Sequence, residues 1–252
     1  MTRSIQAEVP PWDQLPAFSF HELRERVYER LAELKLPLYG SQRMVRKSLL
    51  IVGAWYGSYL LVLLWGPGSI PAAVGTLLLL ALTSLAVQLG VMHDASHHCI
   101  TVARWPNILF RLTLTNMGGS SILWYQNHVV SHHSHTNIPG RDPDIDSFGL
   151  LRFHAAEPWR FWHRWQHWYA LPLYSLKALF WAWVSDFMEV FTQSYGLRGR
   201  RRLLFLLELL LSKAMHFFFF LFLPYQMVGH WLPVLIGYVA FMLFFGASMT
   251  SI

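Results

Sequence analysis

IPAAVGTLLLLALTSLAVQLGVMHDASHH, residues 70–98, is the stretch that decides the fold of this chain. Its first part, residues 70–92, contains no charged side chain. As an α-helix this run would be about 34 Å long, which is enough to cross a hydrocarbon core of about 30 Å. The helix would then deliver the chain directly into His93, His97 and His98. The sequence therefore predicts a membrane span that ends at a histidine cluster.

Three further apolar runs have the length of membrane spans: residues 48–65, 203–223 and 232–252. Hydrophobic residues make up 54% of the chain and charged residues only 13%, well below the level of soluble domains. We therefore predict an all-α integral membrane protein with four transmembrane helices, interfacial helices and a cap that holds the histidines. Residues 1–47 are expected to form an N-terminal segment with an amphipathic helix at 20–36, and residues 48–252 the membrane domain.

Basic residues gather beside two of the spans and predict which side of the membrane each end faces. One group precedes the first span and the other precedes the third: Arg43, Arg46, Lys47, Arg198, Arg200, Arg201 and Arg202. The turns after these spans contain no Lys or Arg, and basic collars favour the cytoplasmic side. The N-terminus and the histidines are therefore expected in the cytoplasm. The net charge of +6 reflects this topology, and no nucleic-acid partner is expected.

Between the second and third spans the apolar segments are short or interrupted. Residues 108–123 are expected to dip into the membrane interface and return, which would bring the second histidine group back to the side of His93. Residues 161–174 are dense in tryptophan, and residues 176–191 carry three charged side chains. Both segments are therefore expected to be interfacial helices.

Seven of the 13 histidines lie between residues 93 and 135, and six of them form two copies of an H-x-x-x-H-H pattern. A helical reading puts the first two histidines of each copy one turn apart on the same face. Neutral imidazole is a good ligand for iron, zinc, copper and nickel. Because six imidazoles exceed what one tetrahedral zinc takes, a two-metal site is favoured over a pair of histidine-rich interfacial turns. The candidate ligands are His93, His97, His98, His128, His132 and His133.

At these residues the chain resembles the membrane fatty acid desaturases, most closely the front-end, linoleoyl-type acyl-CoA branch. The resemblance is carried by GVMHDASHH at 90–98, GGSS at 118–121, NHVVSHHSHTN at 127–137, DPDID at 142–146 and FWHRWQHWYA at 161–170. It implies O2-dependent insertion of a cis double bond into a long acyl chain at a centre of two iron ions. Matching the boxes position by position gives as iron ligands His93, His97 and/or His98, His128, His132 and His133.

The family pattern also includes a third box, of Q-x-x-H-H type, beyond the fourth span, and this sequence ends at Ile252. The resemblance therefore predicts a C-terminally incomplete chain that is inactive alone. It also implies a long-chain acyl substrate and contact with membrane lipids. No flavin or nicotinamide fingerprint and no H-P-G-G motif is present, so the electrons are expected from an external ferredoxin or cytochrome-b-type carrier.

Acidic residues near the boxes are candidates for supporting roles. Asp94 either orients a ligand imidazole or serves as a charge at a helix terminus. Asp142, Asp144 and Asp146 could also orient imidazoles, but a solvated acidic loop is favoured for them.

Other ionisable residues lie in apolar or aromatic surroundings. His163 and His167 are expected to be interfacial polar groups beside tryptophans, with a supporting role at the metal as the less favoured reading. Glu208, Lys213 and His216 fall within the third span, where they either line an acyl tunnel or pair locally.

Three other functions are compatible with the sequence. A lipid hydroxylase or sterol-type oxidase of the same histidine-box superfamily would use similar metals. The chain could also be a metal-binding membrane sensor or transporter, or a truncated, inactive scaffold. The position of the double bond, the acyl carrier (CoA or lipid), the electron donor and the oligomeric state are not specified by the sequence.

Overall fold

The computed structural model describes residues 20–192 and 199–250, and these residues contain helices and no strand. The chain divides into two units, residues 1–39 and 40–252. In the first unit, α1 covers Phe20–Glu33, slightly less than the expected 20–36. The helix ends where Lys35 adopts a left-handed backbone conformation with φ 52°. The rest of the predicted N-terminal segment, residues 1–19, lies outside the described residues.

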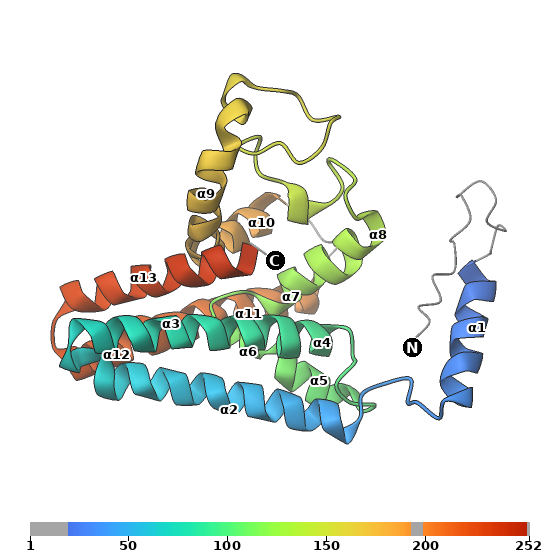
Figure 1. The fold of residues 1–252 in the computed structure, drawn as a ribbon, viewed down its shortest axis with the longest axis horizontal. Coiled ribbons are helices and arrows are strands. Elements are labelled where there is room, and N and C mark those ends of the chain that lie inside the picture. Colours follow the sequence, from blue (N-terminus) through green and yellow to red (C-terminus); the bar gives the residue numbers. More distant parts are fainter. Residues whose placement is uncertain (1–19, 193–198, 251–252) are drawn as a thin grey trace, which may run out of the picture. The chain divides into compact units, whose positions relative to one another are not determined.

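The second unit contains four helical segments long and apolar enough to cross a membrane. The first is α2 (Gln42–Trp65) with η2 (Gly66–Gly68), and the second joins α3 (Ile70–Val87), η3 (Gln88–Met92) and α4 (His93–Ser96). The third joins α11 (Gly199–Phe217), η8 (Phe218–Phe222) and α12 (Leu223–Val228), and the fourth is α13 (Trp231–Thr250). Figure 1 shows α2, α3 and α13 packed side by side. The predicted all-helical class with four candidate spans is confirmed.

Two polar aromatic side chains of α2 form hydrogen bonds across the helices of the bundle. The indole N–H of Trp55 on α2 donates to the Ser84 hydroxyl on α3 at 2.8 Å, and both residues are buried. Tyr59 donates to the backbone carbonyl of Phe219. Since a buried polar group without a partner is costly, these bonds fix the helices at one relative depth.

The segment after the histidine region is one almost continuous helical stretch. It comprises η6 (Phe161–Trp165), α9 (Gln166–Phe180), η7 (Trp181–Ser185) and α10 (Asp186–Thr192). The two interfacial helices expected at 161–174 and 176–191 are therefore joined. In Figure 1, α9 crosses α13, and a Cβ added to Gly246 would lie 2.3 Å from the Ser175 carbonyl oxygen. Glycine at this position allows the two backbones to touch.

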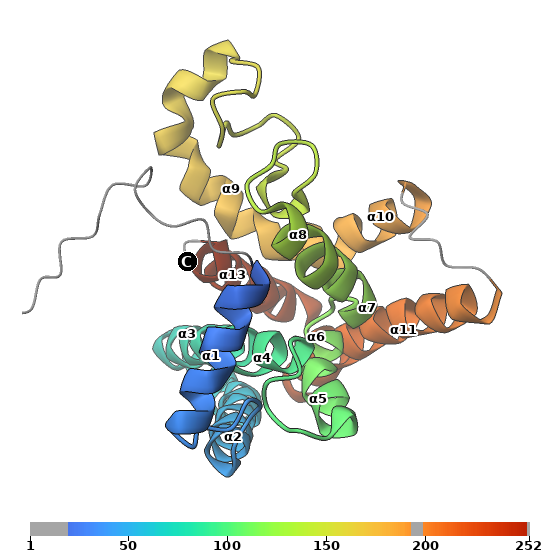
Figure 2. The same cartoon turned by 90° about the vertical axis from the view of Figure 1, so that its right-hand side faces the viewer.

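Short helices connect the second span to this stretch. They are α5 (Arg104–Arg111), α6 (Thr113–Asn116), α7 (Ser121–Trp124), η4 (Tyr125–His132), α8 (His133–His135) and η5 (Pro143–Ile145). Figure 2 shows α6 beside α11, against which it packs. The connection reverses the chain direction, so that η4 returns to the end of the span that carries the first histidine box.

Candidate metal site

The first histidine box lies where the second span ends. The backbone of η3 is a π-helix immediately before His93, and such wide turns are frequent at functional sites. His97 closes the last helical turn through its N–H, which donates to the His93 carbonyl at 3.3 Å. His98 then takes a left-handed conformation with φ 56°, which ends the helix. His93 and His97 therefore lie one turn apart, as expected.

The chain approaches the second box through a turn that requires two glycines. Gly118 has φ +90°, and a Cβ there would lie 2.7 Å from the ring of His216. A Cβ on Gly119 would lie 2.8 Å from the Trp181 ring. Only glycine combines this backbone conformation with such close approach. The turn therefore fits tightly against α11 and η7 just before the chain enters α7.

Carboxylates from neighbouring helices bind the same turn. The Glu208 carboxylate accepts hydrogen bonds from the Ser120 hydroxyl at 2.6 Å and from the Ser121 N–H at 2.7 Å. Asp186 accepts the Ser120 N–H at 3.0 Å and forms a buried ion pair with Lys213 at 2.7 Å. Of the two readings offered for Glu208 and Lys213, local pairing is the one observed. These bonds hold the start of the helix that carries His128.

The second box itself lies on π-helix and not on the α-helix that the sequence suggested. η4 ends at His132, and α8 begins at His133. Trp124 stacks on the ring of His128, with centroids 4.5 Å apart. The rings of His128 and His132 are themselves stacked at 5.0 Å, so they remain neighbours despite the wider turn.

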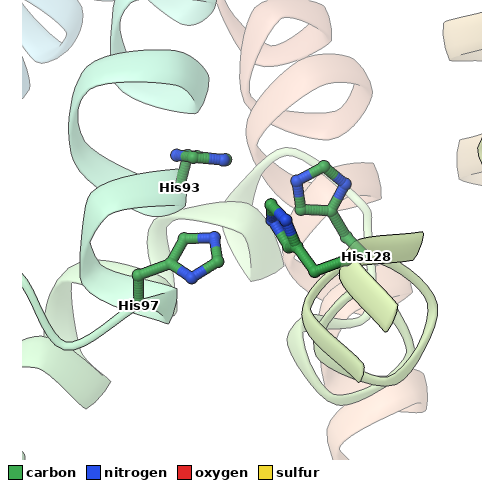
Figure 3. A group of neighbouring side chains, drawn as sticks. His93, His97 and His128 are labelled. Carbon is green, nitrogen blue, oxygen red and sulfur yellow. The ribbon is translucent and has the colours of Figure 1, made fainter. Parts of the chain in front are cut away.

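The two boxes meet. Each of four histidines offers one ring nitrogen, and these nitrogens lie within 4.8 Å of one another: His93, His97, His128 and His133. Figure 3 shows the rings of His93 and His97 facing that of His128. The His93 and His128 ring centroids are 5.3 Å apart, although the residues are far apart in the sequence. Four imidazoles at this spacing could hold a metal ion.

A second group of close ligand atoms shares one histidine with the first. It consists of His128, His132 and Asp144. Nδ1 of His128 lies 2.8 Å from the Asp144 carboxylate, and Nδ1 of His132 lies 2.9 Å from the buried carboxylate of Asp142. A carboxylate that holds Nδ1–H fixes the tautomer and leaves Nε2 to bind a metal.

The protonation of the cluster suits metal binding. Burial, followed by the neighbouring imidazoles, lowers the pKa of His97 to about 4. The pKa of His133 is lowered by the same two causes. Within the described part of the chain, Nε2 of His97 is buried without a hydrogen-bond partner. A neutral imidazole with an unused buried nitrogen fits a metal ion.

A model of the fatty acid desaturase family matches residues 68–252. The chain belongs to the fatty acid desaturase family. It is 31% identical over 176 residues to an acyl-lipid (8-3)-desaturase of Physcomitrium patens, covering 69% of this chain and 36% of that protein. It is 29% identical over 174 residues to an sn-1 linoleoyl-lipid 6-desaturase of Arthrospira platensis, covering 69% of this chain and 47% of that protein. No solved structure matches it significantly.

The comparisons confirm the family that the histidine boxes indicated. The chain spans less than half the length of these two relatives. Their names specify acyl groups carried on lipids, whereas the sequence resemblance pointed to the acyl-CoA branch.

Other candidate residues of this desaturase-family chain lie apart from the grouped ligand atoms. His98 belongs to neither group. His163 is buried, and its ring nitrogens lie 3.1 Å from the Arg160 N–H and 3.0 Å from the Gly149 carbonyl oxygen, so it links two loop segments. His167 lies beside Trp168, with ring centroids 5.3 Å apart.

The structure places the acidic residues near the two boxes more clearly than the sequence does. The acidic loop is not simply solvated, because Asp142 is 2% exposed and bound to His132. Asp94 lies 3.7 Å from Nδ1 of His93 and pairs with Lys47 on α2 at 2.8 Å. The D-P-D motif after the second box was the available signal for Asp142 and Asp144. The Lys47 contact spans helices and had no signal in the sequence.

Proposed function

We propose that the chain carries the histidine-ligated iron site of an acyl desaturase that inserts a cis double bond into a long acyl chain with O2. The observation that carries the proposal is the convergence of His93, His97, His128 and His133 within one small volume in a chain of the desaturase family. The C–H bonds of a saturated chain are too strong for side-chain acids or bases, so a redox metal is required.

The proposed ligands are His93 and His97 from the first box and His128, His132 and His133 from the second. We favour His97 over His98 because only His97 contributes to the grouped nitrogens. Two iron ions are proposed because five imidazoles gather here, more than one tetrahedral metal takes, and because the family resemblance implies two. When bound, iron would supply the redox chemistry through which O2 oxidises the C–H bonds.

The protein's own groups prepare the site for this chemistry. Asp142 and Asp144 hold Nδ1 of His132 and His128, so that the opposite nitrogens are available to a metal. Asp94, fixed by Lys47, lies beside His93 and restrains its ring from the side of the bundle. The partly buried imidazole of His97 stays neutral near pH 7 because its pKa is about 4. These residues orient ligands and hold protons.

The proposed substrate and electron donor both suit a site at the end of a membrane span. We propose a long acyl chain carried on a membrane lipid, because the named relatives act on acyl-lipid substrates. Electrons would come from an external ferredoxin or cytochrome-b-type carrier. The basic collars favour a cytoplasmic position for the histidines, where such carriers would be available.

The test is fatty-acid profiling of cells that express the full-length gene, together with the iron content of the purified protein. We expect a new unsaturated acyl chain and bound iron, and loss of both in His128→Ala. The matched control is His167→Ala, because His167 lies outside both groups of ligand atoms. A hydroxylated product would assign the protein to the hydroxylase reaction instead. Full iron binding by His128→Ala would refute the site.

A further inference from the structure

A cavity of about 460 Å³ lies between the four spans, at the end opposite the histidines. Residues of all four candidate spans line it, among them Tyr59 on α2, Ala73 and Leu77 on α3, Phe220 on η8 and Gly237 on α13. In Figure 1 this end is where α12 meets the starts of α3 and α13. The volume is within the range of ligand-binding pockets.

The lining offers a ligand almost no polar partner. The Tyr59 hydroxyl donates to the Phe219 carbonyl, and the Thr76 hydroxyl donates to the Ala72 carbonyl. The Tyr238 hydroxyl accepts from Trp183 and lies 2.7 Å from the His216 ring. Because these hydroxyls are already paired within the protein, a polar ligand would lose its hydrogen bonds to water without replacement. The cavity therefore suits a purely apolar group.

The packed core separates this cavity from the histidines. Leu80 is the α3 residue nearest to the histidines among those that line the cavity, and His93 lies about 20 Å further along the helix. Between them, Trp55 and Ser84 are buried and hydrogen-bonded to each other across α2 and α3. A substrate chain that ran from the histidines along α2 and α3 would have to displace this pair to reach the cavity. The occupant is therefore expected from the other side of the bilayer.

The open end has the character of a membrane interface. Residues of the η2 turn and of the turn before α13 form part of the lining, including Pro67 and Pro233. Trp65 and Trp231 are exposed beside these turns, and Trp231 stacks on Tyr225 with centroids 4.2 Å apart. Tryptophan and tyrosine favour the level of lipid headgroups. Residues 48–92 and 214–252 contain no Asp, Glu, Lys or Arg, so the opening selects no headgroup charge.

We propose that the cavity binds one acyl chain of a membrane phospholipid from the leaflet opposite the histidines, as a lipid that holds the four spans together. Apolar cavities of only about 150 Å³ stay dry and bind small apolar molecules, so a larger one within a bilayer binds the most abundant apolar chain available. The site is separate from the proposed substrate site, and the proposal does not depend on desaturase activity.

The test is photolabelling of the protein in lipid nanodiscs that contain phosphatidylcholine with a diazirine in the middle of one acyl chain. Gly237→Phe fills the cavity, and a Cβ at that position meets only Leu77 at 3.7 Å. Gly75→Phe on α3 is the matched control, because Gly75 is exposed and its Cβ meets nothing within 4 Å. We expect labelled peptides from residues 59–80 and 220–241, and loss of this labelling in Gly237→Phe but not in Gly75→Phe.

Equal labelling of the two variants would overturn the proposal, because the chains would then contact only the outer surface. Displacement of the label by an added desaturase substrate would also overturn it, since the cavity would then be part of the substrate path. Ala73→Phe fills the cavity from α3 and serves as a second variant if Gly237→Phe does not fold. Labelling does not require iron, so the result is independent of whether the histidine site is active.

Discussion

The buried carboxylate of Asp142 lies 2.9 Å from Nδ1 of His132. It also accepts the backbone N–H groups of Asn137 and Asp144, at 2.8 and 2.9 Å. Burial alone would raise the pKa of Asp142, but these hydrogen bonds together lower it below its usual value. The carboxylate is therefore ionised at neutral pH, and the histidine nitrogen is the donor.

Asp142→Asn should weaken metal binding without removing a ligand. The neutral amide oxygen accepts the imidazole N–H less strongly than the ionised carboxylate does. The tautomer of the His132 ring is then no longer fixed. We expect a loss of roughly 10- to 100-fold in iron affinity or activity. Iron titration of the purified protein measures the change. Asp146→Asn is the control, because Asp146 binds the Phe148 N–H and should leave the titration unchanged.

The two adjacent histidines of the first box should differ sharply. His97 contributes a nitrogen to the group of four, whereas His98 contributes to neither group. His97→Ala should therefore remove most of the bound iron, and His98→Ala should retain it. Elemental analysis of the two purified variants decides between them. The opposite ranking would show that His98, five residues after His93, is the ligand.

Lys47 should act on the site through Asp94. Their ion pair at 2.8 Å joins α2 to the first box, and both side chains are partly exposed. Because such pairs contribute about 0–1 kcal/mol, Lys47→Met should weaken iron binding by roughly two- to fivefold. Lys47→Arg keeps the charge and should recover most of the affinity. If the methionine variant binds iron like the parent protein, Asp94 positions His93 without help from α2.

The sequence predicted those features that depend on local pattern. Apolar length identified the four spans, and the repeated H-x-x-x-H-H spacing identified the histidines that meet. It could not predict that His98 would take a left-handed conformation, because that depends on how α4 terminates in the folded chain. Nor could it predict the buried place of Asp142, since an acidic loop resembles a solvated one until its partner is known.

Gly118 should be intolerant of even a methyl group. Its φ of +90° disfavours any side chain, and a Cβ would press on the His216 ring at 2.7 Å. Gly140 also has a positive φ, +75°, but its Cβ would meet nothing within 4 Å. Gly140→Ala should therefore cost about 1–2 kcal/mol of stability from backbone strain. Gly118→Ala should cost a further 1–3 kcal/mol, roughly, from overpacking.

Thermal unfolding of the two alanine variants, with iron content measured in parallel, separates the two effects. The Gly118 variant should also lose iron, because the turn that it distorts leads into the helix with His128. Equal destabilisation of both variants would mean that the turn shifts freely away from His216, and that the second box is positioned by other contacts.

Acid should destabilise the iron-free protein through His97. Its pKa is about 4 in the folded chain and about 6.5 when unfolded. Between these values the unfolded state holds more protons, so stability falls as the pH is lowered from 6.5 toward 4. His97→Asn removes this contribution and should flatten the decline. Unfolding temperatures of the iron-free parent and variant at pH 7 and pH 5 test this. Parallel curves would show that His97 is exposed enough to protonate without unfolding the chain.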